Sequence, residues 1–163
     1  MIRLALVFVV GLLTGLAVGA VTVLFYYPFW FPPAEVNETV TLLPGKVMVA
    51  EGAFIHPDPD DDVHWGKGGL TVYQQGDALE YFLNADFEVG PGPDFHVYVV
   101  NEQNITDKNQ FDPDRAIELG RLKSFTGSQV YVLTNGVNAG PSHSLVVWCK
   151  TFKQLITSAN VSL

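Results

Sequence analysis

Among residues that could do chemistry, Cys149 comes first, because it is the single cysteine of the chain. A lone cysteine excludes an internal disulfide and cannot cycle between dithiol and disulfide by itself. In a strand, alternation would place Cys149 on the same face as Leu145 and Val147. A thiol among aliphatic side chains is ordinarily a small buried hydrophobe with a raised pKa. We therefore expect an inert core cysteine, with a redox role for Cys149 as the alternative.

Four histidines could act as ligands or general bases: His56, His64, His96 and His143. None stands in a zinc-type spacing such as HExxH, and the chain has no CxxCH haem-attachment motif. His96 alternates onto one strand face with Tyr98, and His64 precedes a strand. Together with Asp94, these two histidines are the candidate polar ligands. A noncovalent haem or a copper ion would suit histidine and Cys149, but nothing in the spacing selects either, so the cofactor is unassigned.

The densest polar cluster runs from His56 to His64 and imitates the start of a calcium loop with three alternating aspartates. An EF-hand needs Gly at the sixth position and Glu at the twelfth, where this chain has Val63 and Gly69. An EF-hand is therefore excluded. We expect a solvated acidic loop, with a loose surface calcium or zinc site as the alternative.

The serines do not indicate an enzyme. Ser128, Ser142 and Ser144 lie outside any GxSxG nucleophile elbow, and no nucleophile–base pair can be assembled from the sequence. We therefore expect no catalytic residues, and a hydrolase ranks last among the functions considered.

The N-terminal segment must position everything that follows it. Residues 4–33 carry no charge, and Leu4–Phe25 supplies the ~20 apolar residues of a membrane-spanning helix. An aromatic run follows, with Tyr26, Tyr27 and Trp30 suited to the membrane interface. We expect prolines at 28, 32 and 33 to end the helix and residues 1–31 to form a retained anchor. A signal peptide cut after Val18-Gly19-Ala20 is the alternative, although the apolar run is long for one.

Charges flanking the segment predict its orientation. Arg3 precedes it, while Glu35 and Glu38 are the first charged residues after it. The positive-inside bias places the N-terminus in the cytoplasm and the C-terminal domain outside it, in the periplasm if the cell is bacterial.

Gly11, Gly15 and Gly19 repeat every four residues and form a bare stripe on the predicted helix. Such spacing lets two helices approach closely in lipid, so we expect another transmembrane protein, or a second copy, at this face. Glycine is also common in membrane helices without such a role.

The rest of the chain is acidic. Nine Lys and Arg against seventeen Asp and Glu give a net charge of −8, and all but Arg3 lie in the outer part. That balance excludes nucleic acid as a partner and favours a basic protein outside the cytoplasm.

After a linker at 32–45, residues 46–163 predict one all-β domain. About 120 residues suffice for a single core, and seven or eight short strands separated by turn signals indicate an antiparallel β-sandwich or barrel. The expected strands are 46–51, 69–75, 79–87, 95–101, 117–123, 129–134, 145–152 and about 155–162. Turns are expected at Gln75–Asp77, Gly90–Asp94, Thr126-Gly127 and Asn135-Gly136, and one helical turn is expected at Asp112–Ala116.

In this order, the pieces of residues 46–163 resemble the DM13 family. The matching residues are Phe54, His64 with Gly66, Asp86-Phe87, Gly92-Pro93-Asp94 before Val97-Tyr98, Leu119-Gly120 before Leu122-Lys123, Gly127, Gln129, Tyr131, Leu133, and Val146–Cys149 with Phe152. The resemblance implies a β-sandwich with an electron-transfer role centred on its shared cysteine, here Cys149.

Anchor and domain together predict a non-enzymatic, single-pass accessory subunit that docks onto a larger membrane assembly, such as an electron-transfer complex. The alternative function is a redox-active domain that uses Cys149 with a bound metal or haem.

Overall fold

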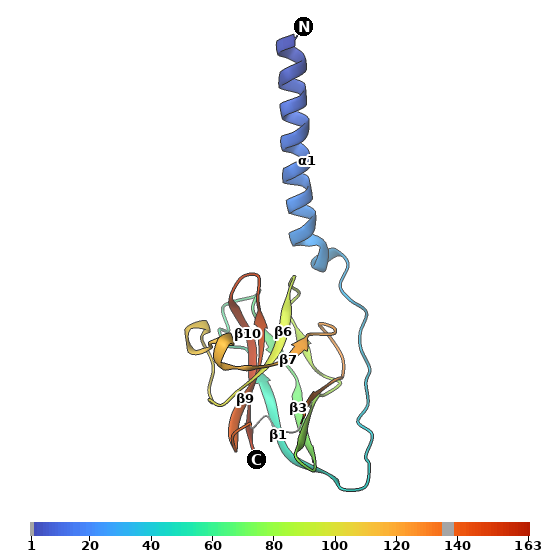
Figure 1. The fold of residues 1–163 in the computed structure, drawn as a ribbon, viewed down its shortest axis with the longest axis vertical. Coiled ribbons are helices and arrows are strands. Elements are labelled where there is room, and N and C mark those ends of the chain that lie inside the picture. The colour runs from blue at the N-terminus through green and yellow to red at the C-terminus, as the bar shows by residue number, and fades with distance from the viewer. Residues whose placement is uncertain (1, 135–138) are drawn as a thin grey trace.

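The computed structural model describes residues 2–134 and 139–163, in which one long helix stands over one end of a β-domain (Figure 1). The helix, α1 (Ile2–Trp30), has 29 residues and is long and apolar enough to cross a membrane. None of its residues is buried against the rest of the described chain. The helix and the domain therefore share few contacts.

Of the three prolines expected to end the helix, Pro32 and Pro33 follow its last residue, Trp30, whereas Pro28 does not end it. Pro28 lies inside its last turn, and Phe31 N donates to Tyr27 O at 2.8 Å beyond it. Proline removes one backbone donor, but ring packing holds the turn together, since Tyr26 stacks on Trp30 at 5.8 Å between centroids. The aromatic run thus belongs to the helix itself.

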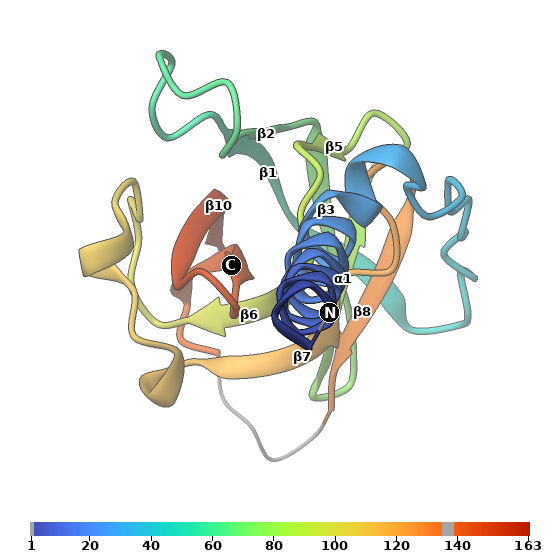
Figure 2. The same ribbon diagram turned by 90° about the horizontal axis from the view of Figure 1, so that it is seen from above.

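Eight antiparallel strands form one sheet in the order β7-β6-β9-β10-β1-β3-β4-β8, and β2 pairs with β5 beside it. The strands are β1 (Lys46–Ile55), β2 (Gly66–Lys67), β3 (Gly69–Gln75), β4 (Ala78–Leu83), β5 (Glu88–Val89), β6 (Phe95–Val100), β7 (Ile117–Arg121), β8 (Gln129–Leu133), β9 (Ser142–Cys149) and β10 (Gln154–Ser162). The expected all-β sandwich is confirmed, and the sheet curls until it is nearly closed (Figure 2).

Side chains close the gap between the outermost strands, β7 and β8. The Tyr131 hydroxyl on β8 donates to Arg121 O on β7 at 3.3 Å and accepts from Lys123 N at 3.1 Å. Gln129 Oε1 accepts from the same Lys123 N at 3.0 Å. Backbone groups left unpaired at a sheet edge are thereby satisfied.

Two expected strands end early for local reasons. The expected strand 79–87 stops at Leu83, because Asn84 N donates to Gly69 O and Phe87 N donates to Asn84 O, each at 2.9 Å. The expected strand 145–152 begins at Ser142 and stops at Cys149, since Lys153 takes φ +49° in the turn to β10. The Asn135-Gly136 turn lies outside the described residues.

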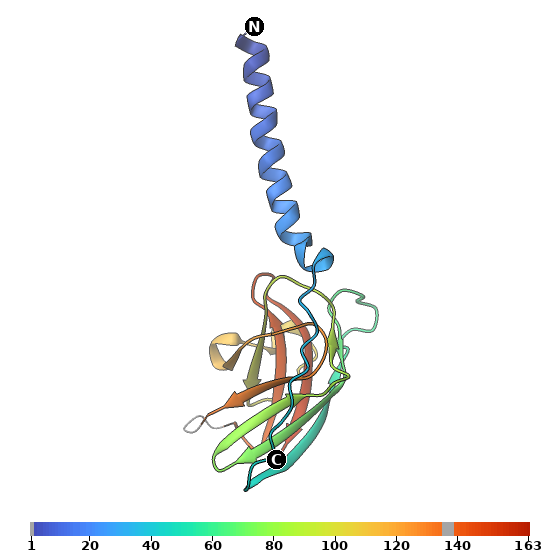
Figure 3. The ribbon, with the colours of Figure 1, turned by 90° about the vertical axis from the view of Figure 1, so that its right-hand side faces the viewer.

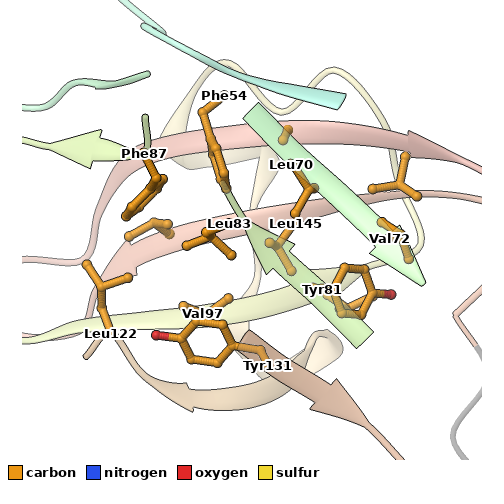
Figure 4. Packing of buried hydrophobic residues seen from close by; sticks show 14 of the residues in the cluster. Phe54, Leu70, Val72, Tyr81, Leu83, Phe87, Val97, Leu122, Tyr131 and Leu145 are labelled. Atoms are coloured by element: carbon orange, nitrogen blue, oxygen red, sulfur yellow. The ribbon is translucent and has the colours of Figure 1, made fainter. Parts of the chain in front are cut away.

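The main core fills the inside of the curled sheet (Figure 4). Tyr81, Leu83, Val97 and Leu145 are among its fully buried members. A second cluster covers the other face of β6, β9 and β10 and contains Tyr98, Val100, Ile105, Phe111, Val146, Trp148 and Leu155. Two 3-10 turns, Lys108–Gln110 and Pro113–Arg115, belong to the loop over this face, the second at the expected helical turn. Strand β9 is therefore buried on both faces.

The segment 32–45 runs along the domain from the base of α1 to the start of β1 (Figure 3). It was expected as a linker, and it has no strand of its own but is held in place by Glu38. The Glu38 carboxylate accepts from Lys123 Nζ at 2.6 Å and Val130 N at 2.7 Å, and Glu38 N donates to Ser128 O at 3.0 Å. Gly127, at φ +87°, allows this approach, since a Cβ there would lie 2.1 Å from Val36 O.

Candidate functional site

Cys149 ends β9 at the end of the domain next to α1. It pairs with Phe95 on β6 and with Gln154 on β10. Its side chain joins Leu145 and Val147 in the main core and is 1% exposed, so the expected face and burial are confirmed. Burial raises the pKa of the thiol and outweighs backbone hydrogen bonds from Phe152 and Thr151 that favour the thiolate. The structure therefore holds Cys149 as a protonated thiol of low nucleophilicity.

A cavity of about 530 Å³ lies beside this thiol, between the base of α1 and the domain. We call it the helix-base cavity. The domain contributes Cys149, Phe95, Ile156, Phe152, Val63, His64 and residues 91–93, and the helix contributes Val21, Thr22, Phe25, Tyr26 and Phe29. Phe152, on the β9–β10 turn, stacks on Phe25 with 5.6 Å between ring centroids. Figure 2 looks down α1 onto this end of the domain.

His64 borders the cavity and is oriented by Asp61. The Asp61 Oδ2 atom lies 2.7 Å from His64 Nδ1, while Oδ1 accepts from the backbone nitrogens of Val63 at 2.8 Å and His64 at 2.9 Å. Hydrogen bonds from the His64 backbone and side chain lower the pKa of Asp61 to about 2. A carboxylate on Nδ1 selects the tautomer whose Nδ1–H donates, which leaves Nε2 as an acceptor.

A comparison with known protein families identifies most of this domain. The model of the family described as "Electron transfer DM13" matches residues 59–161, more than half of the chain. This chain belongs to the DM13 family. The expected resemblance is thereby confirmed. No curated protein and no solved structure matches the chain.

The β-sheet is longer than the segment that the family model matches. Strand β1 precedes residue 59, yet it pairs with β3 along its length and with β10 at Phe54 and Ile55. The sheet would lose a central strand without it. The domain therefore includes residues from Lys46 onward.

His96 and Asp94 do not join Cys149 in the cavity wall of the DM13 domain. His96 alternates to the outer face of β6, where Nε2 lies 3.1 Å from Asp94 Oδ1 and Nδ1 contacts Glu118. Lys150 Nζ donates to Glu118 at 2.8 Å, and this bond, with His96, lowers the pKa of Glu118. These four side chains form a partly buried charge network. Of the three polar candidates, only His64 lines the cavity.

A buried Tyr81–His143 pair is a feature that the sequence analysis missed. His143 Nδ1 lies 2.7 Å from Gly140 O, and Nε2 lies 2.9 Å from the Tyr81 hydroxyl. Since a carbonyl only accepts, Nδ1 carries the proton and Nε2 accepts from Tyr81. Burial lowers the pKa of His143 and keeps it neutral. The two residues lie 62 positions apart, and no local signal links them.

The helix residues singled out from the sequence are all exposed on α1. A Cβ added at Gly11, Gly15 or Gly19 would meet no described atom within 4 Å. Tyr26, Tyr27 and Trp30 are each more than half exposed. Within residues 2–134 and 139–163 the stripe therefore presents a free surface, whereas Tyr26 of the aromatic belt also lines the helix-base cavity.

The acidic loop offers no metal centre within the described ranges, where no three His, Cys, Asp or Glu side chains converge. Its carboxylates instead cap local backbone: Asp58 accepts from Asp60 N at 3.1 Å, and Asp61 orients His64. The loop therefore positions the cavity wall.

Proposed function

We propose that this protein is a single-pass, membrane-anchored, non-enzymatic accessory subunit. Its DM13 domain would lie outside the cytoplasm, and α1 would dock laterally onto a larger membrane assembly that transfers electrons. The observation that carries the proposal is the uncovered apolar helix, which has no residue buried against the described chain. Exposing that surface to water costs ~25 cal/mol per Å², so lipid or a partner helix must cover it.

The glycine stripe supports a partner helix in addition to lipid. Open space faces Gly11, Gly15 and Gly19, which lets another backbone pack closely against α1. Arg3 before the helix and acidic residues after it support a cytoplasmic N-terminus. The net charge of −8 suits a basic docking surface on the partner outside the cytoplasm.

Co-purification of glycine-stripe variants tests the proposal. The full chain carries a C-terminal tag and is extracted from native membranes in mild detergent. Gly15→Leu should reduce recovery of the partner, because the new side chain holds the helices apart. Ala17→Leu is the matched control, since position 17 lies about 200° around the helix from position 15. Equal recovery from both variants would contradict docking through the stripe.

A second candidate function, redox chemistry at Cys149, is favoured by the place of this residue in the cavity wall. It predicts that purified protein carries a chromophore or a titratable thiol that Cys149→Ser removes. The accessory function instead predicts that partner recovery survives Cys149→Ser. The same purification therefore separates the two functions.

A further inference from the structure

We propose that the helix-base cavity binds a neutral, membrane-dissolved quinol, one hydroxyl of which donates a hydrogen bond to His64. The inference rests on the membrane anchoring proposed above and adds a ligand to it. Four properties of the cavity carry the inference: its size, its uncharged lining, its position along α1, and the Nε2 atom of His64, which has no hydrogen-bond partner among the described residues.

The size fits the ring of a quinol. The cavity has a volume of about 530 Å³, within the ~300–1,000 Å³ typical of small-molecule sites. Phe95, Ile156 and Cys149 form its inner wall, and Phe25 with Phe152 forms one side. Such a lining of aromatic, aliphatic and thiol groups suits a flat apolar ring.

The lining selects a neutral ligand. The described lining residues include three titratable side chains, His64, Cys149 and Tyr26. They include no Lys, Arg, Asp or Glu. A phospholipid headgroup carries a phosphate, which proteins bind with cationic side chains or converging N–H donors. The lining therefore favours an uncharged headgroup over a phospholipid.

The level of the cavity along α1 gives access from the bilayer. A hydrocarbon core takes ~20 helical residues, so a span that begins at Leu4 reaches its outer boundary near Leu24. Val21, Thr22, Phe25, Tyr26 and Phe29 line the cavity at this boundary. A ligand with a polar ring and an apolar tail lies at this depth, with the ring in the cavity and the tail in the lipid.

His64 sets the preference for the reduced form. Its Nδ1 is bound by the Asp61 carboxylate at 2.7 Å, so neutral imidazole presents Nε2 as an acceptor. A quinol hydroxyl can donate to that nitrogen, whereas a quinone carbonyl only accepts. Quinol should therefore bind more tightly than quinone.

Equilibrium binding of tritiated decyl-ubiquinol tests the proposal. The full chain is placed in lipid nanodiscs at pH 8 under anaerobic conditions, with empty nanodiscs as the blank for partitioning. We expect saturable binding of one quinol per chain, weaker binding of decyl-ubiquinone, and loss of binding in Thr22→Trp, which fills the cavity from the exposed helix. Leu24→Trp is the matched control, because Leu24 is 72% exposed and lies on another helix face.

A second variant isolates the hydrogen bond. His64→Phe keeps an aromatic ring but removes the acceptor, and quinol affinity should fall ~10-fold, while quinone affinity stays the same. Three results would overturn the proposal: no saturable binding of quinol, binding that neither Thr22→Trp nor His64→Phe changes, or saturable binding of labelled phospholipid in place of quinol.

Carbonate extraction of the source membranes separates this inference from the function on which it rests. If the chain leaves the membrane at high pH, the anchoring fails and the inference with it. If the chain stays in the membrane while no quinol binds, only the quinol site fails.

Discussion

Strand β9 carries a buried titratable side chain near each end, and the surroundings of these two side chains differ. His143 and Cys149 stand six positions apart, about 20 Å along a strand, and both are at most 1% exposed. His143 has both ring nitrogens bonded in a closed core, whereas Cys149 borders a cavity of about 530 Å³. Burial alone therefore does not mark a site. Cys149 differs from His143 in the space beside it, a cavity that His64 also lines.

Removing His143 should give the largest loss of stability. His143→Ala leaves a void and a Tyr81 hydroxyl without its acceptor, so the free energy of unfolding should fall by about 3–4 kcal/mol. Urea unfolding of the full chain in detergent, followed by tryptophan fluorescence, measures this. Tyr81→Phe, which removes only the donor, should cost less. If His143→Ala lowers the free energy of unfolding by less than about 1 kcal/mol, the core around His143 is not tightly packed.

Enlarging side chains on the same face of β9 compares the two environments directly. Val147→Leu adds a methylene to a position of 0% exposure and should cost about 1–3 kcal/mol. Cys149→Leu adds more volume but has the cavity beside it, so its cost should be smaller. The same urea unfolding assay measures the loss of stability in both variants. A greater cost at position 149 would contradict an open cavity there.

The stability of the closed end should depend on pH. Burial lowers the pKa of His143 from its ordinary value of 6.5. Just below pH 6.5, His143 therefore binds a proton in the unfolded chain but not in the folded chain. Stability is present above pH 6.5 and is lost as pH falls through the folded pKa, by at most about 1.4 kcal/mol per pH unit. His143→Leu should remove this part of the slope between pH 7.5 and 5.5. If the slope of stability against pH is unchanged in His143→Leu, groups other than His143 cause the pH dependence.

The smallest expected effect concerns the segment that joins α1 to β1. Burial raises the pKa of Glu38, but hydrogen bonds from Lys123 and Val130 lower it overall. Glu38→Gln should cost about 1 kcal/mol, discounted for partial exposure, and should speed amide exchange at Val130. Glu35→Gln is the control and should change neither quantity. Equal exchange rates in both variants would show that Glu38 does not hold the segment.

The sequence predicted what depends on local pattern. Alternation placed Cys149 with Leu145 and Val147, and turn residues located most strands. Strand ends were misjudged where bonds between distant residues decide, as at Asn84, whose backbone nitrogen donates to Gly69 O. Pro28 does not end the helix, because Tyr26 and Trp30, one turn apart in the same helix, stack across it, and the type of residue 28 alone does not reveal that contact.

The site itself was only partly predictable. Cys149 and His64 were both singled out, but their sharing of one cavity depends on how the 91–93 loop and α1 come together across the fold. The Tyr81–His143 pair joins residues far apart in the chain. Glu38 lies in the segment that was expected to be only a linker. Each of these contacts is set by topology, which residue type and spacing do not encode locally.

The most direct test of the central claim is size-exclusion chromatography of the C-terminally tagged full chain from native membranes, with absorbance spectra recorded across the column. The account predicts that the chain elutes within a large assembly that carries the absorbance of a redox cofactor. Elution alone, as a colourless monomer or dimer, would contradict the claim that this DM13 protein is a subunit of an electron-transfer complex.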